Sequence, residues 1–307
     1  MLRRIPWIAL SCLLLLASQP LQAQEEDLLD MLESLEPETV DFTYATFKTV
    51  RIINAHSMEI PAPGVLQLLI SHRFGAINGG AYEFFGLDQA SMRLGFEYGL
   101  NNRLAVGIGR SNIQKMYDSF IKFKILRQSS GKRKMPITLV AMSEIAANTL
   151  RWRDPDRVNF FSSRLSYVHS LIIARKFSDR LSLQLMPTMV HRNLVETRAE
   201  TNDVYSVGIG GRIKLTGSVT FNFEYYYNLP DQLAEGFVNP MAIGFDIETG
   251  GHVFQLMFTN TQAMTTPIFL TQTEGRVEEG DIHFGFNLAR VFTVSNKARK
   301  KGAENPW

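Results

Sequence analysis

The sequence is poor in cysteine, in long apolar runs and in excess charge of either sign. Its single cysteine, Cys12, lies near the start, which excludes a disulfide-stabilised scaffold. The 22 glycines and 12 prolines are too few for a collagen-like or low-complexity chain, and a 45% hydrophobic content with 21 phenylalanines argues against disorder. With 32 basic and 30 acidic residues, nothing directs the chain to nucleic acid. These absences leave a folded protein of one or two domains.

Residues 1–23 have the three parts of a secretory signal peptide. Arg3 and Arg4 provide the positive charge, residues 5–17 form an apolar stretch, and the small residue Ala23 ends a cleavage site. The apolar stretch is shorter than the roughly 20 residues that a membrane-spanning helix needs, and no later window is long and apolar enough for one. We therefore expect a cleaved signal peptide at 1–23. The mature protein is then periplasmic, secreted or an outer-membrane barrel.

From residue 64 onward, apolar and polar residues alternate with a period of two. In SMRLGFEYGL (91–100), the apolar side chains share one face, whereas Ser, Arg, Gly and Glu share the other, as in a strand between apolar and polar surroundings. The fifth such segment is the least decided, because Val140 and Met142 blur its two faces. Most segments have about the 9–11 residues with which a tilted strand crosses a bilayer. There are twelve, at approximately 64–74, 89–100, 104–111, 116–127, 137–148, 162–176, 181–192, 204–215, 219–228, 240–248, 252–260 and 281–292.

The connections between these segments are alternately long and short. The tight turns at 101–103, 177–180, 216–218 and 249–251 alternate with longer loops, which is the layout of an outer-membrane barrel. A periplasmic β-sandwich also alternates, but its strands are usually shorter. Aromatic residues near strand ends on the apolar face also favour a barrel with interfacial girdles; they are Phe74, Tyr98, Tyr117, Tyr225, Tyr227 and Phe292. We predict an all-β fold: a transmembrane, antiparallel, up-and-down β-barrel of about twelve strands over residues 64–292.

The amino-acid sequences of several segments are similar to those of a known family. GVLQLLISHRFG (64–75), FFGLDQASMRLGFEYGL (84–100) and LLIARKFSDRLSLQLMPTMVHRNLV (171–195) carry the resemblance, which covers most of the mature chain. The sequence resembles the Gram-negative outer-membrane β-barrel family classified as a domain of unknown function, of the DUF fifty-seven seventy-seven type. The resemblance implies a barrel in the outer membrane of a Gram-negative bacterium. It implies no catalytic or ligand-binding residues.

The polar faces of the strands define a charged lumen. A barrel of twelve strands is wider than one of eight, which side chains just fill, and narrower than the 16–18-stranded porins. The charges then either line a narrow pore or pair with one another and close it. The predicted lumen-lining charged residues are Arg73, Arg93, Glu97, Lys122, Lys124, Glu144, Arg164, Arg212, Lys214, Glu224, Asp246 and Glu248.

The sequence offers little for catalysis or for cofactors. The six histidines show no metal-ligand spacing, and the glycine runs VGIGRS and VGIGGR open no helix, so neither a metal nor a nucleotide cofactor is expected. Ser143 and His169 both face the lipid in this pattern, and such a pair is the minimal start of a lipid-acting hydrolase. Because no orienting group or oxyanion donor accompanies them, we favour a polar pair without enzymatic activity.

The two ends of the mature chain differ from the barrel in composition. Residues 24–63 begin with an acidic stretch at helical spacing, which predicts a short periplasmic helix, and then become extended. This segment either lies beneath the barrel, docks a periplasmic protein or enters the lumen as a plug. Residues 293–307 form a basic tail.

These features lead to a non-enzymatic outer-membrane protein in contact with outer-membrane lipid, and most simply to a narrow channel or transporter for small solutes. The alternative is a closed barrel that serves as a structural anchor or as a docking platform for a periplasmic partner of residues 24–63. A lipid-acting hydrolase is the least favoured of the three interpretations.

Overall fold

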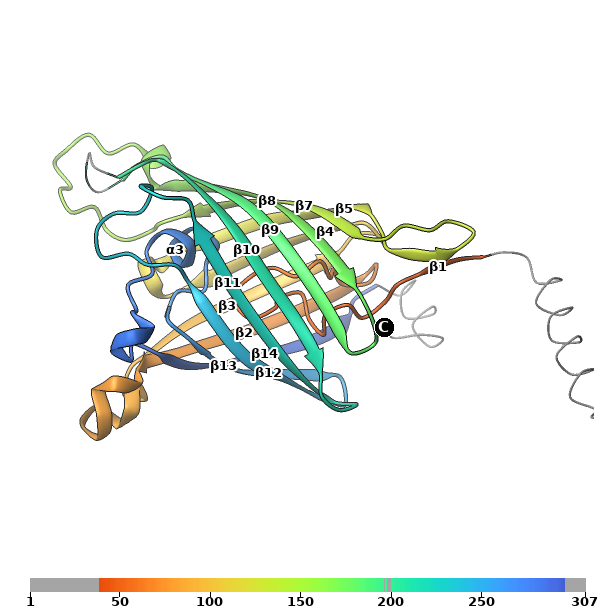
Figure 1. Cartoon of the computed structure of the whole chain (residues 1–307). Coiled ribbons are helices and arrows are strands. Elements are labelled where there is room, and N and C mark those ends of the chain that lie inside the picture. Colours follow the sequence, from red (N-terminus) through yellow and green to blue (C-terminus); the bar gives the residue numbers. More distant parts are fainter. Residues whose placement is uncertain (1–38, 196, 198–199, 296–307) are drawn as a thin grey trace, which may run out of the picture.

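The barrel closes through consecutive antiparallel pairing. The computed structural model describes residues 39–195, 197 and 200–295, and twelve of the strands in this part of the chain form one closed sheet (Figure 1). Each strand pairs with its neighbours in the sequence, and the last pairs with the first to close the barrel. The predicted barrel is therefore confirmed. Its strands are β2 (Val65–Ala76), β3 (Ala90–Gly99), β4 (Leu104–Ser111), β5 (Tyr117–Leu126), β7 (Thr138–Ala147), β8 (Leu165–Lys176), β9 (Leu181–Arg192), β10 (Asp203–Lys214), β11 (Val219–Asn228), β12 (Met241–Thr249), β13 (His252–Thr259) and β14 (His283–Thr293).

A short two-stranded ribbon interrupts this order without entering the barrel. In it, β1 (Val40–Phe42) pairs with β6 (Ser129–Gly131), so that β5 pairs directly with β7. The guanidinium of Arg127 lies 3.9 Å from the ring centre of Phe42 and joins the two arms. The sequence pattern did not predict this ribbon. The predicted signal peptide, the predicted N-terminal helix and residues 296–307 lie outside the described residues.

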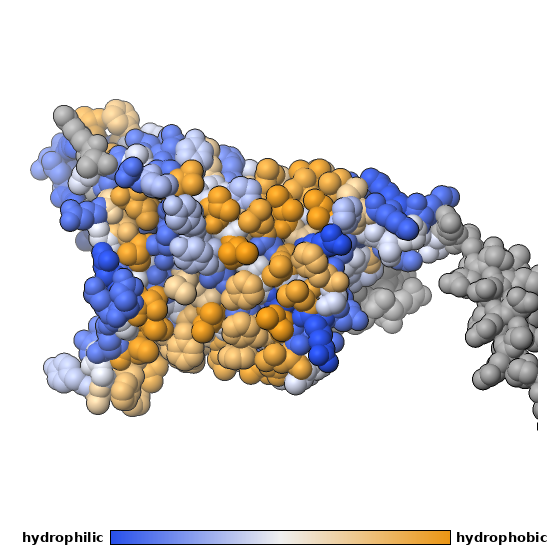
Figure 2. All heavy atoms as spheres, in the orientation of Figure 1, coloured by the Kyte–Doolittle hydropathy of each residue, from blue (hydrophilic) through white to orange (hydrophobic). Residues whose placement is uncertain are grey.

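The period of two places apolar side chains outside and mostly buried side chains inside. On β3, Met92, Leu94 and Phe96 are exposed, whereas Arg93 and Glu97 are buried. Figure 2 shows the result as an apolar surface over the strands, with hydrophilic residues gathered towards the two ends. An exposed apolar belt of this kind suits a lipid environment, because contact between apolar side chains and water costs free energy.

The two ends of the barrel differ. At the short-turn end, tight turns join β3 to β4, β8 to β9, β10 to β11 and β12 to β13, and the β1–β6 ribbon projects there (Figure 1). At the long-loop end lie longer connections that contain η1 (Ile77–Gly86), η2 (Ile113–Lys115), η3 (Phe161–Arg164), α3 (Thr266–Thr271) and η4 (Val277–Glu279). Among the described residues, no helix has the length and apolar character needed to cross a membrane.

The aromatic residues predicted as girdles occupy outward positions near these ends. Tyr98 and Phe292 lie near the short-turn end of β3 and β14, and the other four lie near the long-loop end. Those four are Phe74, Tyr117, Tyr225 and Tyr227. Their positions at the edges of the apolar belt suit side chains that have both an apolar body and, in tyrosine, a polar tip.

Candidate functional site

The barrel interior is occupied by the protein's own chain. Residues 43–63, here called the plug, enter the lumen from the short-turn end as a coil between the strands (Figure 1). Residues 49–58 are buried throughout. Arg51 pairs with His56, and the Ile52 N–H donates to the Ala55 carbonyl at 2.9 Å, so this part of the plug is a small hairpin with Ile53 and Asn54 at its tip.

The tip of the hairpin is held by one carboxylate. Glu224 on β11 accepts hydrogen bonds from three consecutive backbone N–H groups, those of Ile53 at 3.2 Å, Asn54 at 2.9 Å and Ala55 at 3.0 Å. A hairpin turn leaves its N–H groups without partners, and a buried N–H without a partner is costly. The charge of Glu224 is thus balanced by the donors of the turn.

Side chains from three other strands hold the carbonyl groups and one further N–H of the hairpin. Gln255 donates to the Ile52 carbonyl at 2.8 Å, and Asn287 donates to the Ile53 carbonyl at 3.0 Å. Gln184 forms two bonds: its Nε2 donates to the His56 carbonyl at 2.7 Å, and its Oε1 accepts the Met58 N–H at 2.9 Å. The main chain of the hairpin is therefore fixed by wall amides from β9, β13 and β14.

Cations hold the base of the plug. Lys122 on β5 donates to the carbonyls of Val50 at 3.2 Å and Glu59 at 3.3 Å, and also lies 3.2 Å from the Glu97 carboxylate. Arg212 on β10 donates to two plug carbonyls, those of residues 45 and 46, at 2.6 and 3.1 Å. Further ion pairs join Lys48 to Glu248, and Lys124 to Glu59 at 3.8 Å. The wall cations Lys122, Lys124 and Arg212 thus have partners in the plug, and Lys48 of the plug has a partner in the wall.

The wall has a charged part and an apolar part. Strands β2–β5 and β11–β14 supply most of the buried charges and amides. Strands β7–β10 also carry the buried Glu144, Gln184, Arg192 and Arg212, but they supply most of the inward aliphatic side chains, which form one apolar cluster with Phe47, Ile52, Ile53 and Met58 of the plug. These inward apolar residues are Val140, Met142, Ala146, Val168, Ile172, Ala174, Met186, Val190 and Val204. Val140 and Met142 blurred the polar face in the sequence because this part of the lumen is not polar.

A second segment enters the lumen from the long-loop end. The helix α3 is buried over its whole length, with Phe269 and Leu270 in the same apolar cluster as the plug. Thr266 donates to the Glu144 carboxylate at 2.7 Å, and the rings of Phe269 and Tyr226 lie 5.6 Å apart, edge to face. The plug and α3 together close the barrel from its two ends.

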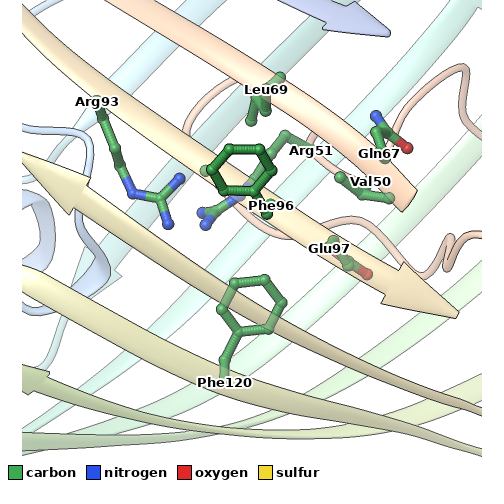
Figure 3. Close-up of a pocket in the computed structure, with 9 residues that line it drawn as sticks. Val50, Arg51, Gln67, Leu69, Arg93, Phe96, Glu97 and Phe120 are labelled. Carbon is green, nitrogen blue, oxygen red and sulfur yellow. The ribbon is translucent and has the colours of Figure 1, made fainter. Parts of the chain in front are cut away.

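Small cavities lie beside the plug in the lumen. Figure 3 shows a cavity between the plug and β2–β5, into which Arg51 and Arg93 direct their guanidinium groups above the ring of Phe120; its volume is about 10 Å³. A second cavity of about 10 Å³ lies between His56, α3 and the apolar wall. Each has room for about one water molecule.

His56 stands out where the plug meets α3. Among the described residues, neither of its ring nitrogens has a hydrogen-bond partner. Its Nε2 lies 3.7 Å from the Glu144 carboxylate, and its ring meets that of Phe120 edge to face. Burial lowers the pKa of His56 well below its ordinary value, and the nearby cations Arg51, Lys122 and Arg93 lower it further. The docked plug therefore favours the neutral imidazole.

Most of the predicted lumen charges face the interior, with three at its margins. Buried and inward are Arg73, Arg93, Glu97, Lys122, Lys124, Glu144, Arg212, Glu224 and Asp246. Lys214 ends β10 and Glu248 lies near the end of β12, both at the short-turn rim.

Arg164 differs from its prediction as a lumen residue. It belongs to η3 and precedes β8, because the strand begins only at Leu165. Its guanidinium lies 3.7 Å from the ring centre of Trp152 and donates to the Asn148 carbonyl at 2.7 Å, within the long loops. The period of two was continued in the sequence beyond the point where the chain turns.

One buried acid was missed by the sequence reasoning. Asp118 on β5 lies on the same face as Lys122 and forms a buried ion pair with Arg93. The available signal in the sequence was that an even number of residues separates Asp118 from Lys122, which places both on the same face of the strand. The wall amides Gln184, Gln255 and Asn287 were missed as well, because an uncharged residue on a polar face gives no indication that it binds a segment elsewhere in the sequence.

On the outer surface, Ser143 and His169 form the pair that the pattern suggested. They are directly opposite each other on β7 and β8, and the Ser143 hydroxyl lies 3.0 Å from the His169 Nδ1. In the described residues no further hydrogen bond of His169 is present to orient its ring, and no cluster of three or more metal-ligating side chains occurs. The pair lacks the third group that a hydrolytic site needs.

Several solved outer-membrane proteins share the barrel shape at low sequence identity. The NanC porin is 9% identical, with 74% of this chain and 98% of that chain covered and a TM-score of 0.46. The KdgM porin is 8% identical, with 75% and 99% covered and a TM-score of 0.43. The COG4313 outer-membrane channel from Pseudomonas putida F1 is 10% identical, with 76% and 97% covered and a TM-score of 0.44.

The family comparison is more specific. No protein of curated function matches the chain. The family model described as "Membrane bound beta barrel domain (DUF5777)" matches residues 47–292, which includes most of the plug and the barrel up to the penultimate residue of β14. The chain therefore belongs to the DUF5777 family of membrane-bound β-barrel domains.

Proposed function

We propose that this protein is an outer-membrane channel or transporter for small solutes, in a Gram-negative bacterium, and that its plug is a gate which closes the lumen. The bond pattern between the plug and the wall carries the proposal. The wall holds the plug through charged and amide side chains, among them Glu224, Gln184, Lys122 and Arg212.

Filling a barrel permanently through a polar interface costs desolvation free energy, because charged groups have to be buried. Replacing buried ion pairs with well-packed apolar residues is often neutral or stabilising, so a lumen that never opened would gain little from buried charges. A lumen that opens has to contact water, and charged side chains left behind by a departing plug are readily hydrated. The charged wall of β2–β5 and β11–β14 supports an interior that is wet in one state and filled in another.

The width of the barrel supports the same proposal. Side chains alone fill a barrel of eight strands, whereas a barrel of twelve needs extra material. Here that material is supplied by a separate segment that enters from one end and by α3 from the other, and neither contributes a strand to the barrel sheet. Withdrawal of the plug therefore breaks no pairing of the barrel.

Single-channel recording of the full-length mature protein in a planar bilayer tests the proposal. Ile52 is fully buried, at 0% exposure, with its Cδ1 close to Gly210 on β10. Ile52→Asp places a charge in this apolar contact and should expel the plug, because burying an unpaired charge costs several kcal/mol. Ile52→Val is the matched control and should remain mostly closed.

We expect discrete conductance steps that are rare in the wild type and in Ile52→Val and frequent in Ile52→Asp. Circular dichroism of the inserted barrel should be alike in all three. Equal silence from all three folded, inserted proteins would reject the gate and favour the closed barrel.

That closed barrel, acting as an anchor or docking platform, is the second candidate. The filling of the lumen by the buried part of the plug and by the buried helix α3 favours it. However, residues 43–63 are bound inside the barrel, so only residues 24–42 are left to meet a periplasmic partner. Capture of such a partner by the wild type, and its loss on deletion of residues 24–42, would support this candidate.

A further inference from the structure

We propose that the lumen wall is a binding site for polypeptide main chain, and that the solutes of the channel are short, unstructured peptides with aliphatic side chains. The plug then occupies the site as a tethered ligand. This inference rests on the proposed function, because a free peptide reaches the wall only after the plug has left it.

The wall directs its polar side chains mainly at main-chain atoms. Glu224 accepts three successive N–H groups, Gln255 and Asn287 donate to two successive carbonyls, and Gln184 both donates to and accepts from the chain at positions two residues apart. Lys122 and Arg212 each reach two carbonyls. These amide groups recur in every peptide.

Bonds to the plug's side chains are fewer. Arg73 donates to the Asn54 side chain at 2.8 Å, and Lys48 and Glu59 form ion pairs with the wall near the rim. Buried main chain always needs partners. What is particular here is that fixed side chains on six strands of the wall supply most of them, while bridge pairing of the plug with a barrel strand is limited, in the described residues, to Pro63 and Gly99 at the end of β3. A wall of this kind recognises a chain with little regard for its sequence.

The apolar part of the wall offers a second binding feature, an aliphatic surface. Ile52 and Ile53 belong to the apolar cluster to which β7–β10 contribute most of the wall residues, while their own carbonyls are bound by Gln255 and Asn287 on the charged side. The lumen thus offers amide-binding groups and an aliphatic surface within the width of one chain. Peptides with aliphatic side chains carry both features, whereas oligosaccharides and inorganic ions lack the aliphatic part.

The test uses the full-length Ile52→Asp variant, whose wall is unaltered. A synthetic peptide with the sequence of residues 46–59 is added to the open channel, and block is measured as the fraction of time closed. A second peptide has N-methyl groups on the three amides that correspond to Ile53, Asn54 and Ala55. A third has alanine in place of Lys48, Asn54 and Glu59, and maltohexaose serves as a non-peptide solute.

We expect the native peptide to block, and the alanine-substituted peptide to block within about tenfold of the same concentration. The N-methylated peptide should need about 100-fold more or fail to block, since it loses three bonds to a charged acceptor. Maltohexaose should pass or be excluded without block. Equal block by the native and N-methylated peptides, or by maltohexaose, would overturn main-chain recognition.

Binding of the fluorescent native peptide to the detergent-solubilised variant, measured by anisotropy, separates this inference from the gate. If Ile52→Asp is folded and silent in the bilayer but binds the peptide and not its N-methylated form, the channel fails and the main-chain site stands. If Ile52→Asp conducts, but no peptide blocks or binds, the gate stands and the peptide inference is wrong.

Discussion

The carboxylate of Glu224 accepts the backbone N–H of Asn54 at 2.9 Å, at the tip of a hairpin that fills the barrel. The same carboxylate accepts the two flanking N–H groups, so a single side chain of the wall holds the turn. This relationship gives the gate its most sensitive position, because none of the three donors has another hydrogen-bond partner in the part of the chain that the structure describes.

Glu224→Gln should open the channel. The amide keeps the shape of the side chain but replaces an acceptor oxygen by a donor, and a hydrogen bond to a charged group contributes about 1.5–3 kcal/mol. We expect at least a tenfold rise in open probability in single-channel records. Asp118→Asn is the control, since it removes a buried wall carboxylate whose partner is Arg93 rather than the plug. A similar rise in both variants would mean that the plug responds to any lost charge.

Gly210→Val should displace the plug by steric contact. A Cβ at Gly210 would lie 2.5 Å from the Ile52 Cδ1, so the added side chain needs the space that the plug occupies. We expect more frequent opening, with a cost to plug docking of about 1–3 kcal/mol. Ile52→Ala in the same protein should restore closure, because it vacates that space. Gly217→Ala, at a turn glycine with open space around it, is the control.

If the Gly210→Val channel stays as closed as the wild type, Ile52 does not sit against β10 in the closed state. If Ile52→Ala leaves the double variant open, the displacement acts through the barrel rather than through the plug.

Acidification should loosen the plug through His56. The docked state lowers the pKa of His56, so it favours the neutral ring, and its stability is retained above the free-chain pKa of about 6.5 and lost as the pH falls below that value. The groups facing the ring are Glu144, Arg51, Lys122 and Arg93. We expect open probability to rise below about pH 6.5 by up to about tenfold per pH unit.

His56→Gln should remove most of this pH dependence between pH 5 and 7, whereas His252→Gln at the short-turn end should retain it. An unchanged profile in His56→Gln would assign the effect to another group.

The outer-surface pair of Ser143 and His169 should be structural. A double-mutant cycle with alanine at the two positions, read from urea unfolding in detergent, should give an interaction of about 0.5–1.5 kcal/mol. Phospholipid turnover by the purified protein should be the same in the wild type and in both single variants. Turnover that depends on both residues would instead identify a hydrolase.

The fold was predictable because each strand has its own alternation of apolar and polar residues. The alternation around Arg93 and Glu97 is local, and it indicates strand, face and approximate end without knowledge of any partner strand. The turn before Leu165 was less visible, and Arg164 was therefore placed in the lumen. The β1–β6 ribbon was not predicted, because its strands have only three residues each and are too short to show an alternation.

The site was only partly predictable. Glu224 was identified as a lumen residue, but nothing in its own segment indicates that it binds the amides of residues 53–55, which lie about 170 positions earlier. For residues 24–63 the sequence left three possibilities open: a segment beneath the barrel, a docking segment for a partner, and a plug in the lumen. Choosing among them needs the long-range packing of Ile52 and Ile53 against β7–β10, which periodicity does not contain.

A reversible covalent lock tests the gate most directly. The mature chain lacks cysteine once the first 23 residues are removed, so Ile52→Cys with Gly210→Cys introduces one pair of thiols at a position where the plug and β10 touch. We expect the oxidised protein to show no conductance steps in a planar bilayer. Addition of a reductant to the same membrane should bring steps at least as frequent as those of the wild type. Equal conductance before and after reduction, with the disulfide verified by mass spectrometry, would contradict the claim that residues 43–63 gate the lumen.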